Sequence, residues 1–220
     1  MTRVGILTIG QSPRTDVVPV LREAFGAHVP LVEAGALDGL TRDDLEARPD
    51  RLDGERLVTR LADGTEIHVG ASFVHPLVES ALHSLATRAD VVLMLCTGTF
   101  PAFRCARPVL YPSRVLAGLV SAIQPTHLGV MTPDVAQLAH QEARWRSVVP
   151  RTTVVAASPY GSEAAVRAAA GRLSSAGADL VVLDCIGFGQ AMRDVVGDMT
   201  PAPILVASRC LARVASELLR

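Results

Sequence analysis

Short apolar runs rich in Val, Ile and Leu alternate with longer amphipathic segments along this chain of 220 residues. The runs at residues 91–96 and 180–183 contain no polar residue, which is typical of strands buried on both faces. Residues 72–88 instead carry apolar side chains three or four positions apart, which predicts a helix with one buried face. This alternation predicts an α/β fold with mostly parallel sheets and flanking helices. The expected strands are 4–9, 29–33, 91–96, 127–131, 153–157, 180–185 and 204–207, and the expected helices are 13–25, 41–47, 72–88, 115–123, 133–147, 162–175, 190–196 and 208–219.

Two local signals predict how neighbouring elements begin and connect. Thr41 stands just before a short amphipathic segment, where its hydroxyl can cap the first turn of a helix. Asp63-Gly64 lies between the strand-like segments 57–61 and 66–70, and Asp-Gly is a preferred dipeptide of tight hairpins. We therefore expect a β-hairpin at this point of the chain.

Two segments far apart in the sequence, 89–98 and 178–187, share one pattern. Each begins with Ala-Asp, continues as a buried strand, ends that strand with a cysteine and places a glycine two residues later. Ligands of open parallel sheets bind outside the carboxyl ends of the strands. We therefore expect two pseudo-symmetric lobes with a cleft between them, and one cysteine from each lobe, Cys96 and Cys185, at that cleft. The expected lobes comprise residues 1–112 with 208–220, and residues 113–207.

The composition excludes several classes of function. All 21 basic residues are arginine, so a Schiff-base lysine, a pyridoxal-phosphate enzyme and a Walker-type phosphate lysine are excluded. The formal net charge is −1 and no basic cluster occurs, which argues against a nucleic acid or an anionic membrane as partner. The mean hydropathy of +0.33 is positive, but no apolar run approaches the roughly 18 residues of a membrane-spanning helix. The N-terminal segment also lacks the pattern of a signal peptide, so we expect a cytoplasmic protein.

Cysteine and histidine usage bears on metals and cofactors. The four cysteines and six histidines are spread along the chain without C-x-x-C or similar ligand spacing. In the cytoplasm the cysteines are expected to be thiols rather than disulfides. We therefore expect neither a metal site nor a bound cofactor.

The chemistry that remains is that of the matched pair, Cys96 and Cys185. A thiolate is a good base and nucleophile. Two thiols on opposite faces of one carbon can remove a proton on one side and return it on the other, which inverts a stereocentre without a cofactor. The alternative is that both cysteines only fill space behind their sheets, since cysteine is among the most buried residue types. Cys105 and Cys210 have no comparable context and are expected to be structural.

Three turns could hold a carboxylate beside these thiols. The first strand–helix turn contains a flexible glycine, polar side chains and free amides, although an ordinary capped helix start is the alternative. The turn after Cys96 supplies two hydroxyl groups around a glycine. The turn after Cys185 has a glycine but no hydroxyl group, so it could bind a less polar part of a ligand. The candidate binding residues are Gly10, Gln11, Ser12, Arg14, Thr97, Gly98, Thr99 and Gly187.

Three motifs, spread over essentially the whole chain, resemble those of the AroM family. They are Thr8-Ile9-Gly10-Gln11-Ser12-Pro13-Arg14, Pro112-Ser113-Arg114, and Leu183-Asp184-Cys185-x-Gly187-Phe188 with Arg193-Asp194. That family in turn resembles the aspartate/glutamate racemase superfamily, which includes hydantoin racemase, maleate isomerase and arylmalonate decarboxylase. The resemblance implies a two-lobed fold with a cysteine-containing turn in each lobe, catalysis without a cofactor, and dimerisation as an option. It also implies that Cys96 and Cys185 are the paired acid and base, with Gln11, Ser12, Thr97 and Thr99 around the substrate carboxylate.

The sequence therefore leads to one hypothesis and two alternatives. The hypothesis is a cofactor-independent racemase or isomerase that acts on a small carboxylate by proton transfer between two thiols. One alternative is a decarboxylase in which Cys185 alone donates a proton. The other is a carboxylate-binding protein without catalytic activity, linked to aromatic amino-acid metabolism through the resemblance to its family.

Overall fold

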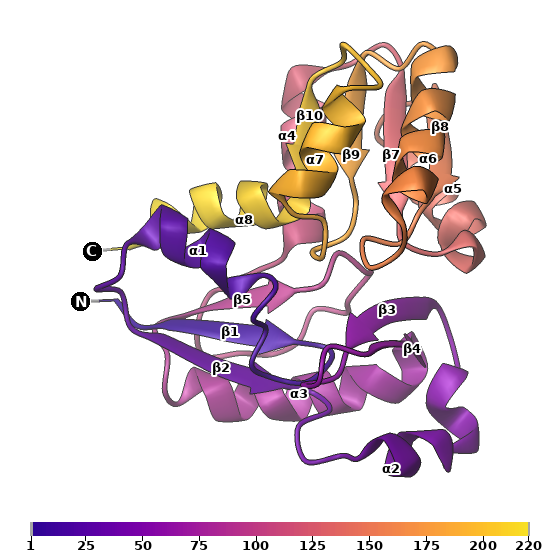
Figure 1. Ribbon diagram of the computed structural model, residues 1–220. Helices are drawn as coiled ribbons and strands as arrows, with labels where there is room; N and C mark the ends of the chain where they lie inside the picture. Colours follow the sequence, from indigo (N-terminus) through magenta and orange to yellow (C-terminus); the bar gives the residue numbers. More distant parts are fainter. Residues whose placement is uncertain (1, 220) are drawn as a thin grey trace. The chain divides into compact units, whose positions relative to one another are not determined.

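The computed structural model describes residues 2–219, which divide into two compact units (Figure 1). The N-terminal unit consists of residues 2–111 and 213–219, and the C-terminal unit consists of residues 112–212. Each unit contains one four-stranded sheet in which all strands are parallel. The expected α/β fold with parallel sheets and flanking helices is thereby confirmed.

The sheet of the N-terminal unit has the strand order β2-β1-β5-β6. The two central strands are buried at every residue, as their continuous apolar sequences predict. The long helix α3 contacts β1 and β2, and Figure 1 shows α1 on the opposite face of the sheet. A β3–β4 hairpin and two short helices complete the unit. The bounds are β1 Val4–Thr8, α1 Val18–Phe25, β2 Leu31–Gly35, α2 Arg42–Glu46, η1 Pro49–Leu52, β3 Arg56–Arg60, β4 Glu66–Gly70, α3 Ala71–Ala86, β5 Val91–Leu95 and β6 Val109–Leu110.

The sheet of the C-terminal unit repeats this topology. Its strand order is β10-β9-β7-β8. Followed from β8, this sheet therefore contains its second strand in chain order (β8), then its first (β7), its third (β9) and its fourth (β10). The N-terminal sheet has the same sequence of strands when it is followed from β2. The bounds are α4 Pro112–Ile123, β7 Leu128–Thr132, η2 Val135–Gln137, α5 Leu138–Arg146, β8 Thr152–Ala156, α6 Glu163–Ser175, β9 Leu180–Leu183, α7 Gln190–Gly197, β10 Ile204–Val206 and α8 Ala207–Ser216.

In the N-terminal unit, the Ala-Asp pair of the repeated pattern fastens the third strand to the first. The backbone N–H of Arg3 donates to the Asp90 carboxylate (2.8 Å), and the backbone N–H of Asp90 donates to the Arg3 carbonyl (2.8 Å). Ala89 packs against Gly5, where an added Cβ would lie only 3.0 Å from the Ala89 Cβ. A small residue on each side therefore lets the end of α3 approach the sheet closely.

The C-terminal unit has the equivalent contacts, made by Asp179 and Ala178. The backbone N–H of His127 donates to the Asp179 carboxylate (3.0 Å), and the Asp179 N–H donates to the His127 carbonyl (3.0 Å). Ala178 packs against Gly129, where an added Cβ would again lie 3.0 Å away. The Ala-Asp half of the sequence repeat is therefore explained by packing and backbone pairing. The cysteines lie at the other end of the two strands and do not take part in these contacts of the Ala-Asp pairs.

The structure confirms the predicted helix cap and hairpin and corrects the first residues of two predicted helices. The predicted cap is confirmed, because the Thr41 hydroxyl accepts the Asp44 N–H and the Asp44 carboxylate accepts the Thr41 N–H. The predicted hairpin is also confirmed, and Gly64 takes the positive φ (87°) that its turn needs. The helix predicted from residue 13 begins instead at Val18, after a separate turn over residues 15–17 in which the Val17 N–H donates to the Arg14 carbonyl (3.2 Å). The helix predicted from residue 133 begins at Leu138, after the short η2.

None of the helices within residues 2–219 combines the length and the apolar character that crossing a bilayer requires.

The hydrogen bonds of the Asp179 carboxylate should make the stability of the fold depend on pH in acid. The pKa of Asp179 lies below its ordinary value of 3.8, because the Thr126 hydroxyl and the His127 and Thr126 amides donate hydrogen bonds to its carboxylate. A depressed pKa stabilises the fold above the unfolded-state value, and this contribution is lost as pH falls through the folded-state pKa. We expect Asp179→Asn to lower the urea midpoint near neutral pH, with a difference from wild type that shrinks below about pH 4. The exposed Glu23→Gln substitution serves as control, and equal midpoints for Asp179→Asn and wild type at all pH values would contradict the prediction.

Candidate active site

Parallel pairing brings Cys96 beside the turn that follows β1. Thr8, the last residue of β1, is paired with Leu95, the last residue of β5, so Cys96 and Ile9 leave the sheet at the same edge. Because the carboxyl ends of parallel strands share one edge, the candidate residues of the N-terminal unit lie on two adjacent turns.

The turn after Cys96 is tightly packed around the sulfur atom. Cys96 is 7% exposed, and its Sγ accepts the backbone N–H of Gly98 at 3.4 Å. A Cβ at Gly98 would lie 2.7 Å from the Leu57 side chain, so only glycine fits here without a shift of its neighbours. Thr97 is buried and Thr99 is exposed.

The turn after β1 packs against the end of β3 in the hairpin. The Gly10 N–H donates to the Thr8 hydroxyl (3.3 Å), and the Gln11 N–H donates to the Arg60 carbonyl (3.0 Å). A Cβ at Gly10 would lie 2.3 Å from both the Arg60 carbonyl oxygen and the Thr59 Oγ1. Glycine is therefore required at position 10 by the close approach of β3.

The polar side chains of Gln11 and Ser12 bond to neighbouring loops. The Gln11 amide donates to two carbonyls, those of Leu37 (3.2 Å) and Leu40 (2.6 Å), and accepts the Ala62 N–H (2.8 Å). Ser12 donates both its N–H and its hydroxyl to the Asp38 carboxylate, each at 2.7 Å. These bonds hold two loops, the one between β2 and α2 and the turn of the β3–β4 hairpin, against the turn after β1, and they engage the groups that the sequence offered as ligand contacts.

Arg14 is 3% exposed and forms a bidentate pair with Asp16. Its Nε and one terminal nitrogen each donate to Asp16 at 2.8 Å, and the other terminal nitrogen donates to the Thr8 hydroxyl at 2.9 Å. Burial raises the pKa of Asp16, but the Arg14 hydrogen bonds and the charges of Arg14 and Arg60 outweigh it, so the pKa lies below 3.8. The Arg14 guanidinium therefore binds groups within its own turn and at the end of β1.

In the C-terminal unit, Cys185 occupies the position that corresponds to Cys96. The Asp184 N–H donates to the Met131 carbonyl and so extends the β7–β9 pairing by one residue. Cys185 is 6% exposed and packs in the same apolar cluster as the fully buried Phe188. A Cβ at Gly187 would lie 2.3 Å from the Tyr160 hydroxyl. This hydroxyl group from the β8–α6 loop supplies the polarity that the sequence of the Cys185 turn lacks, and no local pattern at Tyr160 indicated it.

Asp184, next to Cys185, holds the end of β9 from its other face. It is 1% exposed and accepts hydrogen bonds from the Trp145 indole (2.7 Å) and the Arg144 guanidinium (3.0 Å). Arg144 also donates to the Ser113 carbonyl (3.2 Å) and lies over the Trp145 ring. Arg144 therefore connects two of the motifs noted in the sequence, the one around Ser113 and the one around Asp184.

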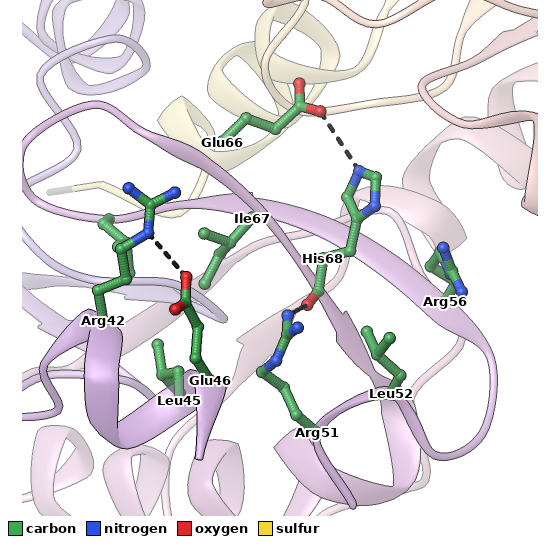
Figure 2. A pocket seen from close by; sticks show the side chains of 10 residues that line it. Arg42, Leu45, Glu46, Arg51, Leu52, Arg56, Glu66, Ile67 and His68 are labelled. Carbon is green, nitrogen blue, oxygen red and sulfur yellow. Dashed lines mark hydrogen bonds and ion pairs between the residues drawn. The ribbon is translucent and has the colours of Figure 1, made fainter. Parts of the chain in front are cut away.

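A cavity of about 250 Å³ lies elsewhere in the N-terminal unit, between α2, η1 and the β3–β4 hairpin (Figure 2). Several of its polar groups have partners among the lining residues: Arg42 pairs with Glu46 (3.1 Å) on α2, His68 with Glu66 (3.3 Å) on β4, and Arg51 donates to the His68 carbonyl (2.7 Å). None of the candidate residues from the sequence lines it. The lining residues are Arg42, Leu45, Glu46, Arg51, Leu52, Arg56, Leu61, Glu66, Ile67 and His68.

Across residues 2–219, no group of three or more His, Cys, Asp or Glu side chains is arranged to hold a metal ion.

A family model described as AroM protein matches residues 4–219. The chain belongs to the AroM family. No protein of curated function matches this AroM-family sequence significantly.

Solved structures with the fold of this AroM-family chain belong to the aspartate/glutamate racemase superfamily, which confirms that resemblance. Glutamate racemase from Francisella tularensis, in complex with D-glutamate, has a TM-score of 0.65 and 11% identity, covering 99% of this chain and 81% of its own. Maleate isomerase Iso from Pseudomonas putida S16 has a TM-score of 0.65 and 13% identity, with coverages of 99% and 92%. Unliganded arylmalonate decarboxylase has a TM-score of 0.60 and 15% identity, with coverages of 100% and 92%. At these identities the likeness shows a shared fold.

Removing the charge of Asp184 should destabilise the protein. Asp184→Asn leaves the Arg144 guanidinium without its ionic partner at a buried position, so we expect a loss of about 2–3 kcal/mol in the free energy of unfolding, measured in urea. The exposed Asp194→Asn change should stay within about 0.5 kcal/mol of wild type. Equal stability of Asp184→Asn and wild type would contradict the role of this network.

Removing Arg14 should destabilise the β1 turn. Arg14→Met leaves the Asp16 carboxylate, only 18% exposed, without its bidentate partner, and we expect a loss of about 3 kcal/mol near neutral pH. The pKa of Asp16 should rise, because burial then acts against one remaining cation, Arg60. The loss relative to wild type should therefore diminish in acid as Asp16 becomes protonated. Arg42→Met, which breaks an exposed pair with Glu46, is the control and should cost at most about 1 kcal/mol; a similar cost for both variants would contradict the prediction.

Proposed function

We propose that this AroM-family chain is a cofactor-independent racemase or isomerase that acts on a small carboxylate with an acidic C–H bond. Cys96 and Cys185 would be the opposed acid and base. One observation carries the proposal: Cys96 directly follows β5 and Cys185 follows β9 after one residue, Asp184, so each cysteine comes just after the third strand of its sheet, and the two sheets have the same topology. A space-filling role does not require the same residue type at both positions.

The proposed reaction needs no oxidant, reductant or added group. One cysteine, as thiolate, removes the proton from the carbon next to the carboxylate, and the electron pair of the C–H bond is delocalised into that carboxylate. The other cysteine, as thiol, gives its proton to the opposite face of the same carbon. The product is the substrate with inverted configuration at that carbon, and the two cysteines have exchanged protonation states.

The proposed carboxylate contacts come from the turn after Cys96. Thr97 and Thr99 supply hydroxyl groups, and Gly98 lets the backbone approach the ligand closely. Gly10, Gln11, Ser12 and Arg14 contribute by fixing the shape of the adjacent turn, since their polar groups bond within the protein. In the turn after Cys185, Gly187 would let the backbone approach the ligand closely, as Gly98 does in the turn after Cys96, and Tyr160 lies beside it.

The names of the solved relatives suggest where a substrate search should begin. One structure holds D-glutamate, and the others are named for maleate and arylmalonate. All three compounds carry two carboxylates. A first panel should therefore contain small dicarboxylates and acidic amino acids.

Assembly and location complete the proposal. We propose a cytoplasmic protein that forms a homodimer and binds a small carboxylate, with no nucleic-acid partner. Light scattering coupled to size exclusion measures the mass of the assembly, and a mass of one chain would contradict the dimer.

Isotope exchange tests the two-thiol mechanism directly. In heavy water, a substrate from the panel should gain deuterium at the carbon beside its carboxylate, as followed by NMR. Cys96→Ser and Cys185→Ser should each reduce the exchange rate at least about 100-fold, since each removes one acid–base group. Cys105→Ser and Cys210→Ser are matched controls, because both cysteines lie outside the two turns, and they should retain the exchange.

Other outcomes would replace the proposal by one of its alternatives. Release of carbon dioxide that depends on Cys185 but not on Cys96 would indicate a single-cysteine decarboxylase. Carboxylate binding that survives both substitutions, without any exchange, would indicate a binding protein without catalytic activity. Exchange that persists in both serine variants would exclude the cysteines from the chemistry.

A further inference from the structure

The cavity between α2, η1 and the β3–β4 hairpin combines apolar side chains with arginines in its lining (Figure 2). Among its apolar residues, Leu45 and Leu61 are buried, Ile67 is half-buried and Leu52 is 40% exposed. An apolar cavity of about 150 Å³ can hold a benzene molecule. The volume of about 250 Å³ found here is therefore sufficient for a six-membered ring with a short polar tail.

The charged side chains of the lining favour an anion. Three arginines and two glutamates line the cavity, which gives it a formal charge of +1 with histidine neutral, whereas the whole chain carries −1. The guanidinium group of arginine matches a carboxylate in geometry and can bind it through two parallel N–H groups. A small carboxylate with an apolar body therefore fits both the charge and the apolar surface of this cavity.

Two of the arginines have N–H groups that other residues do not use. Arg42 donates its Nε to Glu46 (3.1 Å), and its terminal nitrogens make no hydrogen bond within residues 2–219. Arg51 donates one terminal nitrogen to the His68 carbonyl (2.7 Å), and its other nitrogens make no hydrogen bond to any residue that the structure describes. The two side chains come from different elements, α2 and η1 (Figure 2). A carboxylate can therefore accept N–H groups of this lining without breaking either existing bond.

The hairpin that walls this cavity also touches the two turns that carry candidate active-site residues of the same unit. The Arg60 carbonyl accepts the Gln11 N–H (3.0 Å), and the Leu57 side chain lies 2.7 Å from the position of a Cβ at Gly98. The residues next to Leu57 and Arg60 in the sequence line the cavity. A ligand that holds the hairpin in place therefore supports the shape of both turns.

We propose that this cavity binds a small monocarboxylate with an apolar body, and that the bound ligand stabilises the β3–β4 hairpin. The carboxylate accepts hydrogen bonds from Arg42 and Arg51, and the apolar body packs on the leucine and isoleucine side chains. The site is separate from the candidate active site, whose residues do not line it. The inference does not depend on the proposed function, since a protein without racemase or isomerase activity would keep this site.

An NMR titration locates the binding and measures its strength. The ¹⁵N-labelled full-length chain is titrated with 3-phenylpropionate, and the backbone amide shifts are followed. We expect shifts that saturate below about 10 mM probe and that are largest among residues 42–68. Two related probes should each bind at least about tenfold more weakly: 3-phenylpropanamide, which lacks the charge, and acetate, which lacks the apolar body.

Two substitutions with matched controls test the assigned side chains. Arg42→Met removes unused donors and should weaken binding of 3-phenylpropionate about tenfold. Arg146→Met is its control, because Arg146 is equally exposed (58%) and also pairs with a glutamate four residues away. Leu52→Trp fills part of the cavity and should weaken binding at least as much. Ile123→Trp, at a comparably exposed apolar position of the C-terminal unit, should leave binding unchanged.

Hydrogen exchange measures the effect of the ligand on the hairpin. At a probe concentration of ten times the dissociation constant, exchange of the β3 and β4 amides should slow about tenfold, because the probe binds only the closed hairpin. In Arg42→Met at the same concentration the slowing should be only about twofold, as a tenfold weaker affinity requires. The β7 amides of the C-terminal unit serve as the internal control and should exchange at an unchanged rate.

Five results would each overturn the inference. They are the absence of saturable shifts, shifts that are largest outside residues 42–68, equal affinity for 3-phenylpropanamide, equal weakening by Arg42→Met and Arg146→Met, and unchanged hairpin exchange with bound probe. Loss of binding in Cys96→Ser but not in Arg42→Met would assign the probe to the candidate active site instead. Thermal unfolding of each variant shows whether its fold is retained. None of these measurements depends on turnover, so their outcome is distinguishable from that of the deuterium experiment.

Discussion

Parallel pairing of the third strand with the first strand in each sheet is the constraint on which the rest of the structure depends. It places the end of β5 beside the end of β1, and the end of β9 beside the end of β7. All of these strands are buried along their whole length, and each fully buried Val, Leu or Ile contributes about 1.5–3 kcal/mol, so the register is strongly specified. The Asp90 and Asp179 pairings fix that register at the amino ends, and the cysteines then leave the sheets at the carboxyl ends.

A second feature of the structure is that polar groups near the end of β1 have hydrogen-bond partners within the protein. Gln11, Ser12 and Arg14 form a closed set of hydrogen bonds with loops and with Asp16 and Asp38. The bonds of the buried Arg14 are the costly ones to break, because their loss would leave buried donors and acceptors unpaired. A turn held in this way keeps its shape while a ligand binds beside it, which is the requirement for positioning a thiol against one carbon. The residue choices in the motif around Gln11 therefore reflect the demands of the fold.

The sequence was sufficient for the class of fold and for most strands, because buried parallel strands are continuous apolar runs. It was not sufficient for β6, Val109–Leu110, since two residues carry no periodicity. It also missed the late start of α1, because the pairing of Arg14 with Asp16 and Thr8 depends on contacts that no local pattern encodes. The repeat around the two cysteines was visible, but its Ala-Asp half has a structural cause that appeared only with the neighbouring glycines. Tyr160 lies against Gly187 from the loop between β8 and α6, so spacing along the chain could not have identified this contact.

The central claim is that both thiols serve one substrate carbon. A crystal structure of the wild-type chain with a small dicarboxylate, selected by its effect on thermal unfolding, tests this claim most directly. The account predicts that the Cys96 and Cys185 sulfur atoms each lie about 3.5 Å from the same ligand carbon, on opposite sides of it. A bound dicarboxylate whose carbons contact only one of the two sulfurs, or neither, would contradict it.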